Sequence, residues 1–383
     1  MPNNSYIVKI QGNEELLTGV YYEVDFSQPP IGEGGMGRVY KGIRVDTKSN
    51  IKRPVAVKFL YEGLPQTVLD RAIREASIQI KCENLIEMIA FVNMEQHENG
   101  GTVVNRYHVV SELLDGVMLH DLIKGKTTDY EGKEIAYAQE MYALYKNDRK
   151  SFVIAIVKNV LAGLGYLHDA GYVHRDIDTS NIIITDDRRI KVIDFGVAHK
   201  IEAHKKGQLL THVGSFLGKA EYAAPELVLG DVTHQNATTD IYAVGILMFH
   251  LLTGKLPFSG SLQDVMQMQR EIDVPVNMIG DKEMRNIVAK ATMKKQSKRY
   301  QSTAEFRVAL DDISYKTNIP APPETPLGLK ATDKEVDGFD NERRKRNPIK
   351  SMIQEANDHF ALYSGITAII GLLVGILISY LLS

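Results

Sequence analysis

The strongest constraint on the fold of this 383-residue chain is a short polar loop followed by two apolar runs. Residues 173–181 read VHRDIDTSN, and the triplet DFG occupies residues 194–196. Between them, residues 182–193 hold two β-branched runs on either side of a DDRR turn. Runs of this kind around a polar turn predict a β-hairpin. The hairpin would bring the loop and the triplet to the same end of a small sheet.

Three oxygen-bearing side chains would lie at that end, those of Asp176, Asn181 and Asp194. Carboxylate and amide oxygens are ligands that Mg²⁺ takes in proteins, and a carboxylate left without a metal can accept the proton of an alcohol. This combination suits phosphoryl transfer, in which the protein positions the reactants and offsets phosphate charge. The loop therefore favours a phosphotransferase.

The two motifs together resemble the catalytic loop and the magnesium loop of eukaryotic-like protein kinases. The resemblance covers about residues 20–313. It implies an α+β, bilobal fold, with a small antiparallel β-sheet lobe that carries one helix and a large, mainly helical lobe. It also implies that Asp176 accepts the proton of the substrate hydroxyl and that Asn181 and Asp194 hold Mg²⁺.

A glycine-rich turn near the N-terminus supports the resemblance. Gly32, Gly34 and Gly37 form G-x-G-x-x-G, which dinucleotide-binding folds also use. In those folds the turn opens a helix, whereas the residues after Gly37 are typical of a strand, which favours the kinase loop that covers the phosphates of ATP. By this resemblance, Ile31, the three glycines and Val39 contact ATP.

A lysine stands inside the apolar run 54–60, where its charge needs a partner. The amphipathic segment 68–80 offers Glu75, which matches the glutamate of the family's small-lobe helix. The resemblance implies that Lys58 bridges Glu75 and the phosphates of ATP, with Ala56 beside the nucleotide. The alternative is that Lys58 extends to solvent and Glu75 lies on a wet helix face.

Residues 107–116 predict a strand that continues into the connection between the lobes. The resemblance makes Ser111 the gatekeeper of the nucleotide site and gives the backbone of Glu112 and Leu114 hydrogen bonds to adenine. The following stretch, residues 125–150, is polar and longer than the family usually needs. We expect a solvated insertion there.

Several other matches to the family are structural. The resemblance pairs a buried Glu226 with Arg299, and such a pair serves the fold and not the chemistry. It makes Asp240 the residue that holds the backbone of the catalytic loop. It also gives His174 a packing role under Phe195.

Two positions depart from the family. Serine/threonine kinases typically have a lysine two residues after the catalytic aspartate and a threonine ahead of the closing marker of the activation segment, but this chain has Asp178 and Lys219. We hypothesise that the charges have changed places, so that Lys219 supplies a catalytic cation and Asp178 holds it. The alternative is drift in a catalytically weak enzyme, because a carboxylate near phosphates is repulsive. The departures weaken the choice of Ser/Thr over Tyr, although this loop lacks the arginine of tyrosine kinases.

Arg175, beside the catalytic aspartate, predicts regulation by phosphorylation. Such an arginine can bind a phosphate on the activation segment and order that segment. Thr211 and Ser215 are the candidate acceptors. We therefore expect autophosphorylation at one or both of these residues.

The C-terminal residues predict a membrane anchor. Residues 361–382 carry no charge and are long enough, as a helix, to cross a bilayer, with a buried core helix as the alternative. The basic run at 343–346 precedes them and by the positive-inside rule keeps the domain in the cytoplasm. Residues 314–360 are expected to form a juxtamembrane linker. Gly371 and Gly375 form G-x-x-x-G, which suits helix pairing and a homodimer.

Composition narrows the remaining classes. The net charge of −3 gives no support for nucleic-acid binding. Cys82 is the only cysteine, which excludes an internal disulfide and fits a reducing compartment. Residues 1–19 lack signal-peptide features, and we expect an N-terminal extension with a strand at residues 6–10.

Together these features predict a cytoplasm-facing, membrane-anchored Ser/Thr protein kinase that uses ATP and Mg²⁺ and phosphorylates proteins, including itself. It resembles the bacterial membrane-bound members of the family. Every catalytic position holds the expected residue type, which argues for an active enzyme. The alternative is a membrane-tethered pseudokinase scaffold that binds nucleotide without efficient turnover. A small-molecule phosphotransferase is less favoured, because the activation segment belongs to enzymes that accept peptides.

Overall fold

A computed structural model of the chain describes residues 6–97, 103–195, 199–200 and 219–314. The chain divides into two compact units, residues 1–322 and 323–383, and every described residue belongs to the first unit. Several expected features lie outside the described residues: Thr211, Ser215, the linker beyond Ser314, the basic run 343–346, and the membrane helix 361–382 with Gly371 and Gly375.

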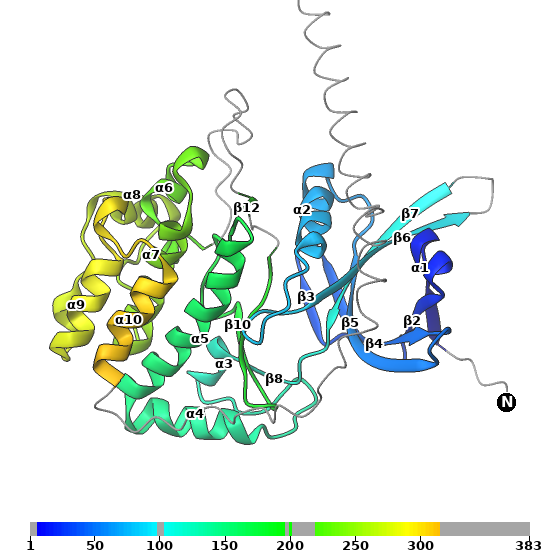
Figure 1. Ribbon diagram of the computed structural model, residues 1–383, viewed down its shortest axis with the longest axis horizontal. Coiled ribbons are helices and arrows are strands. Elements are labelled where there is room, and N and C mark those ends of the chain that lie inside the picture. Colours follow the sequence, from blue (N-terminus) through cyan, green and yellow to red (C-terminus); the bar gives the residue numbers. More distant parts are fainter. Residues whose placement is uncertain (1–5, 98–102, 196–198, 201–218, 315–383) are drawn as a thin grey trace, which may run out of the picture. The chain divides into compact units, whose positions relative to one another are not determined.

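The small lobe is built on a seven-stranded antiparallel sheet, which confirms the predicted lobe (Figure 1). Its strands run in the order β1-β2-β4-β5-β7-β6, and β3 pairs with β4. Strand β4 begins at Gly37, so the glycine-rich turn opens a strand, as predicted. The strands are β1 (Ile7–Ile10), β2 (Val20–Asp25), β3 (Gly32–Gly34), β4 (Gly37–Asp46), β5 (Ile51–Leu60), β6 (Met88–His97) and β7 (Val103–Glu112).

Apolar side chains cover both faces of this sheet. Helix α2 (Gln66–Ser77), expected at residues 68–80, buries Ala72 and Ala76 against β6 and β7. Because side chains alternate along a strand, Val55 and Val57 of β5 point to the opposite face. The cluster on that face comprises Ile10, Val20, Tyr22, Val24, Val55, Val57, Val92 and Val110.

The N-terminal segment is part of this sheet. Strand β1 pairs with β2 and places Ile10 opposite Tyr22, and both side chains are buried in the second cluster. The strand expected at residues 6–10 is therefore confirmed. Its other members, Ile7 and Val8, are exposed.

A short helix follows this strand and was not predicted. Helix α1 (Asn13–Thr18) begins after Gly12, whose N–H donates to the Glu15 carboxylate at 3.1 Å. It ends at Gly19, whose φ of 77° lies in the left-handed region. The described small lobe thus carries two helices, and the expectation of one was wrong. A helix of six residues is too short to give a clear apolar period in the sequence.

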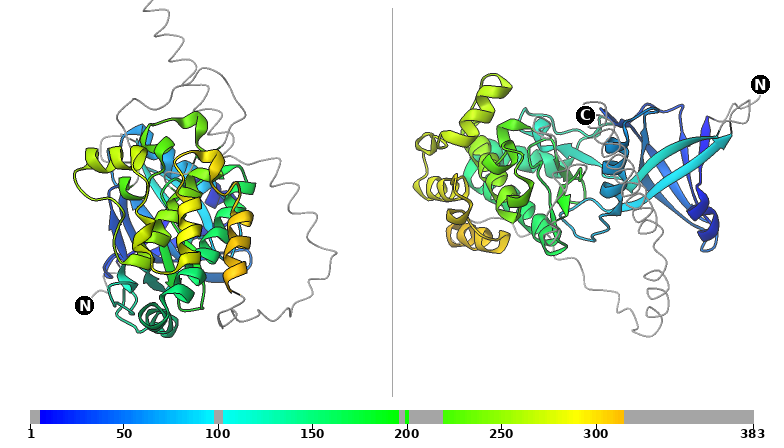
Figure 2. Two further views of the ribbon diagram at one scale, coloured as in Figure 1. Left: turned by 90° about the vertical axis from the view of Figure 1, so that its left-hand side faces the viewer. Right: turned by 90° about the horizontal axis from the view of Figure 1, so that it is seen from above.

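The large lobe is mainly helical, as predicted, and its helices gather at the end of this unit away from β1 (Figure 1, Figure 2). Its central helix is α5 (Arg149–Asp169), which packs against α4, α7 and α10. The other helices are α3 (Leu119–Leu122), α4 (Ala136–Asn147), α6 (Pro225–Val228), α7 (Ala237–Thr253), α8 (Leu262–Glu271), α9 (Lys282–Ala291) and α10 (Thr303–Ser314), with 3₁₀ turns at Ala220–Tyr222, Val232–His234, Val276–Met278 and Gln296–Lys298.

Helix α5 alone, among the described residues, is long and apolar enough to cross a membrane. Most of its apolar side chains are buried in the main core, where Phe152, Ile156, Val160 and Leu164 are at most 1% exposed. A helix that is buried on nearly all sides is typical of the centre of a helical lobe. We therefore assign α5 to the core.

The prediction of a solvated insertion at residues 125–150 is wrong for the second half of that segment. Residues 136–147 form α4, which buries Ala138, Met141 and Tyr145 against the large-lobe core. Surface ion pairs connect the segment to other elements, Lys41–Glu131 at 3.0 Å and Arg188–Glu140 at 2.7 Å. The polar residues seen in the sequence are the outer face of an amphipathic helix.

The predicted hairpin is confirmed. Strands β10 (Ile182–Thr185) and β11 (Ile190–Val192) are antiparallel neighbours, and β8 (Gly116–Met118) pairs with the other edge of β10. A second small sheet joins β9 (Tyr172–Val173) to β12 (His199–Lys200). These two sheets hold both ends of the catalytic loop.

A buried ion pair fixes the end of the activation segment, as predicted. Arg299 is 2% exposed and donates to both carboxylate oxygens of Glu226, at 2.8 and 3.0 Å. Burial alone would raise the pKa of Glu226, but the hydrogen bonds from Arg299 hold it below its ordinary value. The pair ties α6 to the segment that precedes α10.

If strand β1 is part of the folded small lobe, shortening the side chain of Ile10 must destabilise that lobe. We expect Ile10→Ala to lower the free energy of unfolding by about 2–5 kcal/mol, because it leaves a cavity in a closed cluster. Ile7→Ala is the matched control, since Ile7 is 53% exposed in the same strand. Urea denaturation of the full chain measures both. Equal, small losses would show that this strand does not contribute to the core.

Candidate active site

A buried carboxylate holds the backbone of the catalytic loop. Asp240, at the start of α7, accepts the backbone N–H groups of His174 at 2.9 Å and Arg175 at 2.8 Å. His168 lies 2.7 Å from the same carboxylate. Burial alone would raise the pKa of Asp240, but these hydrogen bonds, led by that of His168, lower it. The charge of Asp240 is thereby kept, and the loop is fixed through its backbone, as predicted.

The candidate base lies directly beyond this anchor. Asn181 donates both hydrogens of its side-chain amide to Asp176, to the carbonyl oxygen at 2.8 Å and to the carboxylate at 3.0 Å. This leaves the amide oxygen of Asn181 as the atom of that side chain able to bind a cation. Burial raises the pKa of the Asp176 carboxyl, and the charges of Asp178 and Asp194 add to the effect. A carboxylate with a raised pKa is a better proton acceptor.

Asp194 lies near enough to the candidate base and to Glu75 of the small lobe for its charge to raise the pKa of both. It has a φ of 65°, a conformation that only a well-packed surrounding maintains in a residue with a side chain. Next to it, Phe195 is 1% exposed and packs edge-to-face on His174, with ring centroids 5.8 Å apart. The packing role predicted for His174 is confirmed. The buried ring holds the backbone that carries Asp194.

The predicted pair in the small lobe is present but loose. Lys58 Nζ lies 3.9 Å from Glu75 Oε2, and that oxygen accepts no hydrogen bond from any described residue. Burial raises the pKa of Glu75 to about 7, although the charge of Lys58 acts in the opposite direction. The nearby charge of Asp194 raises it further. The alternative of a wet, exposed Glu75 is wrong, because this residue is 6% exposed.

Glycine suits the two positions of the turn, Gly37 and Gly34, for different physical reasons. A Cβ at Gly37 would lie 2.0 Å from the carbonyl oxygen of Phe59, so the close approach of β4 to β5 requires glycine there. A Cβ at Gly34 would meet no atom within 4 Å, so this glycine serves no packing need. Open backbone of this kind is what a phosphate can approach. Glu33, which directly precedes Gly34, accepts the hydroxyl of Tyr61 at 2.8 Å.

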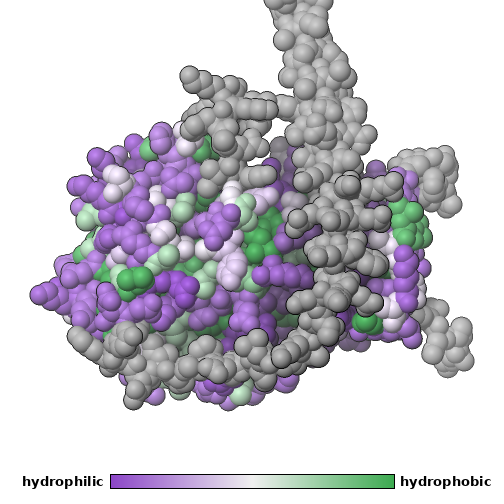
Figure 3. Space-filling model, viewed as in Figure 1, coloured by the Kyte–Doolittle hydropathy of each residue, from purple (hydrophilic) through white to green (hydrophobic). Residues whose placement is uncertain are grey.

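The other residues expected at the nucleotide lie on adjoining strands. Ile31 donates its N–H to the carbonyl of Val39 at 2.8 Å, and Gly32 is the register partner of Val39. Val39 in turn lies opposite Lys58, and Ala56 lies opposite Ser111. The strands β3, β4, β5 and β7 thus carry these residues side by side. Figure 3 shows hydrophobic residues gathered where the two lobes meet, on a face that is otherwise mainly hydrophilic.

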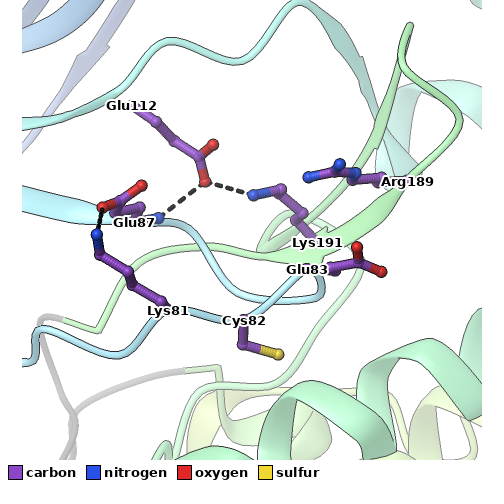
Figure 4. Close-up of a pocket in the computed structure, with 7 residues that line it drawn as sticks. All are labelled: Lys81, Cys82, Glu83, Glu87, Glu112, Arg189 and Lys191. Carbon is purple, nitrogen blue, oxygen red and sulfur yellow. Dashed lines mark hydrogen bonds and ion pairs between the residues drawn. The ribbon is translucent and has the colours of Figure 1, made fainter. Parts of the chain in front are cut away.

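The connection between the lobes contains an ion pair that the sequence reasoning missed. The Glu112 carboxylate accepts from Lys191 Nζ at 2.5 Å and from the N–H of Glu87 at 2.8 Å, as Figure 4 shows. Its side chain is therefore engaged by Lys191 and Glu87, and its backbone N–H donates to the carbonyl of Glu87 at 2.9 Å. Lys191 is 4% exposed inside an apolar strand, the same signal that identified Lys58.

This pair lines a cavity of about 300 Å³ behind the connection. Its walls carry opposite charges that neutralise each other in pairs, among them Lys81 with Glu87 at 3.6 Å. The lining residues are Lys81, Cys82, Glu83, Glu87, Glu112, Arg189 and Lys191. We assign it a structural role.

The two residues that depart from the family lie in contact. Lys219 Nζ donates to Asp178 Oδ1 at 2.8 Å and to Ser180 Oγ at 2.5 Å. The backbone N–H of Lys219 donates to Asp176 Oδ1 at 3.3 Å. Asp178 is 1% exposed, whereas 46% of the Lys219 side chain is exposed. The predicted contact is confirmed, and it lies beside the candidate base.

The donor set fits a magnesium nucleotide. Asn181 and Asp194 offer oxygens, Glu75 keeps one buried oxygen without a hydrogen bond, and Gly34 leaves open backbone. Among the described residues, those expected around the nucleotide lie on neighbouring elements. Gly196, the last residue of the DFG triplet, lies outside the part of the chain that the structure describes.

Comparison with known proteins identifies related sequences. The protein kinase domain family matches residues 27–307. The serine/threonine-protein kinase PknL of Mycobacterium tuberculosis is 30% identical over 301 residues, which cover 76% of this chain and 66% of PknL. The serine/threonine-protein kinase PknB of the same species is 28% identical over 309 residues, 78% of this chain and 44% of PknB.

A probable serine/threonine-protein kinase of Clostridium perfringens, CPE1738, is 27% identical over 297 residues, 76% of this chain and 38% of that protein. In each of these relatives the match spans less than two thirds of the protein's length. The similarity therefore concerns the domain that the structure describes.

The raised pKa of Glu75 predicts a pH-dependent stability. Because the folded state favours the protonated acid, the contribution of Glu75 to the free energy of unfolding is full below pH 4.5 and is lost as pH rises through about 7. Glu75→Gln removes this titration. We expect the melting temperature of the variant, relative to the natural chain, to rise by a few degrees between pH 5 and pH 8 without nucleotide. A constant difference across that range would contradict the assigned pKa.

Proposed function

Because the chain belongs to the protein kinase domain family, we propose that it transfers the γ-phosphate of ATP to serine or threonine hydroxyls of proteins. The observation that supports this most directly is the arrangement around Asp176. Its carboxylate is held by Asn181, carries a raised pKa, and lies near a second carboxylate, that of Asp194. Such a group can accept the hydroxyl proton of a substrate beside a bound cation.

In this proposal each residue has a defined task. Asp176 orients the substrate hydroxyl and takes its proton, while Asn181 and Asp194 hold Mg²⁺. Lys58, guided by Glu75, binds the phosphates, and the turn around Gly34 covers them through its backbone. Bound ATP supplies the phosphoryl group, and Mg²⁺ offsets its negative charge.

The adenine end is expected to rest on the small-lobe strands and the connection. Val39 and Ala56 would contact the base, with Ile31 and Gly32 above it. The backbone of Glu112 and Leu114 would form its hydrogen bonds. The N–H of Glu112 already donates to the carbonyl of Glu87, so the carbonyl oxygen of Glu112 is its backbone atom proposed to bind adenine.

The pseudokinase scaffold is the competing function. It is less supported, because Lys58, Glu75, Asp176, Asn181 and Asp194 all hold the residue types that phosphotransfer needs. The relatives named above are also described as kinases. The scaffold would require nucleotide binding without turnover.

We also propose that the kinase is anchored to a membrane through residues 361–382, with its domain in the cytoplasm. The uncharged sequence of this stretch and the basic run 343–346 support the anchor. Pairing through Gly371 and Gly375 would raise the local concentration of kinase domains and favour phosphorylation in trans.

The full chain in detergent, incubated with radiolabelled ATP, Mg²⁺ and a generic protein substrate, should label both itself and the substrate. Asp176→Asn should reduce the rate at least about 100-fold, because it removes the proton acceptor. Asp25→Asn, at an exposed carboxylate in β2, should label as the natural chain does. Nucleotide binding by the natural chain without any labelling would establish the scaffold in place of the kinase.

The same labelled protein tests the regulatory expectation. Mass spectrometry should find phosphate on Thr211, on Ser215 or on both, because Arg175 lies beside the candidate base and can bind an added phosphate. Asp176→Asn incubated in parallel should carry none. Labelled protein in which neither residue is modified would refute this regulatory site.

A further inference from the structure

The candidate site brings two carboxylates to one residue. The backbone N–H of Lys219 lies 3.3 Å from Asp176 Oδ1, and its ammonium group lies 2.8 Å from Asp178 Oδ1. A transferred phosphate would add further negative charge to this region. Like charges at such distances repel strongly unless a cation intervenes.

Among the described residues, Lys219 provides an ammonium group that is bound to this cluster. Its Nζ binds Asp178 and Ser180, and its own backbone N–H binds Asp176. Both ends of Lys219 are therefore fixed. Its main chain is bound to Asp176, and its ammonium group is bound to Asp178 and Ser180. A side chain that is 46% exposed at this point faces the open side of the site.

Asp178 is placed to orient this cation and not to bind phosphate. One of its oxygens accepts the N–H of Ser180 at 2.5 Å and the hydroxyl of Ser180 at 2.7 Å, in addition to Lys219. Its carboxylate is thus surrounded by donors and is nearly inaccessible. A buried carboxylate of this kind holds a partner cation in one position.

We propose that Lys219 is the cation that faces the transferred phosphate, and that Asp178 positions it. The inference rests on the proposed kinase function and deepens it. The cation comes from the segment that precedes α6, whereas the loop itself supplies its orienting partner. Relative to the family pattern of a lysine in the loop and a threonine in the segment, the lysine has moved to the segment and a carboxylate stands in the loop.

The transfer step defines what Lys219 stabilises. The substrate hydroxyl gives its proton to Asp176, and an electron pair on its oxygen forms the new bond to the γ-phosphorus. The bond from that phosphorus to the bridging oxygen breaks, and its electron pair leaves on ADP. Lys219 would interact with the oxygens of the phosphoryl group during this passage, where charge stabilisation contributes most.

A structural role for the ion pair makes a different prediction. If Lys219 and Asp178 only clamp the activation segment to the loop, then removing either partner should cause the same loss. If Lys219 acts on phosphate, then removing its charge should lower kcat much more than removing the charge of Asp178. Asp178→Asn keeps an oxygen for Ser180, so it separates these two cases.

The test compares kcat and the KM for ATP of the full chain carrying Lys219→Met, Lys219→Arg or Asp178→Asn. Lys219→Met should lower kcat about 100-fold and leave the KM for ATP within about threefold, because the interaction is made in the transition state. Lys219→Arg should recover most of the loss. Asp178→Asn should lose about tenfold or less. Lys282→Met, at an exposed lysine in α9, is the matched control.

The reversed pair, Asp178→Lys with Lys219→Thr, gives an independent check. It should be at least about tenfold more active than Lys219→Met, because it returns a cation to the site from the loop. Melting temperatures of all variants with and without Mg²⁺ and ATP verify folding. Equal losses for Lys219→Met and Asp178→Asn, or a kcat for Lys219→Met within about threefold of the natural chain, would overturn the inference. An inactive natural chain would instead contradict the proposed function.

Discussion

The arrangement of the site depends on one buried carboxylate, that of Asp240. It accepts two consecutive backbone N–H groups of the catalytic loop, and a hydrogen bond with His168 keeps it ionised. Because these contacts are made to the main chain, they set the loop without consuming the side chain of Asp176. Arg175, the second of the two residues, has a φ of 69°, and the contact to Asp240 offsets the cost of that conformation. The geometry beyond the loop follows from this anchor.

The charged residues of the site include two acids with a raised pKa, and each acid has a lysine nearby. Burial raises the pKa of Asp176 and of Glu75, and the charge of Asp194 adds to the effect on both. Each has a lysine beside it, Lys219 through the backbone at 3.3 Å and Lys58 at 3.9 Å. Lys58 forms only a loose pair with Glu75, whereas the ammonium group of Lys219 is bound by Asp178 and Ser180. The small lobe thus provides one acid and one cation, whereas the acid of the catalytic loop has its nearby lysine from the segment that precedes α6.

The sequence predicted the hairpin, the Glu226–Arg299 pair, the packing of His174 on Phe195 and the contact of Asp178 with Lys219, because fixed motifs determine these positions. It did not predict α1, whose six residues are too few to show a period, or the packing of α4, whose polar face dominates its composition. Lys191 was missed although it stands in an apolar strand, because its partner Glu112 lies 79 residues away. Contacts between distant elements depend on the fold, which local pattern does not contain.

We expect one site between the two lobes to hold a metal and a nucleotide, with Lys219 facing the phosphate. A crystal structure of the chain with Mg²⁺, a non-hydrolysable ATP analogue and a substrate peptide tests this claim most directly. The account predicts metal bound by the side-chain oxygens of Asn181 and Asp194, and Lys219 Nζ within hydrogen-bond distance of a γ-phosphate oxygen. A nucleotide bound without metal, or a Lys219 that contacts only Asp178 and Ser180 in the complex, would contradict it.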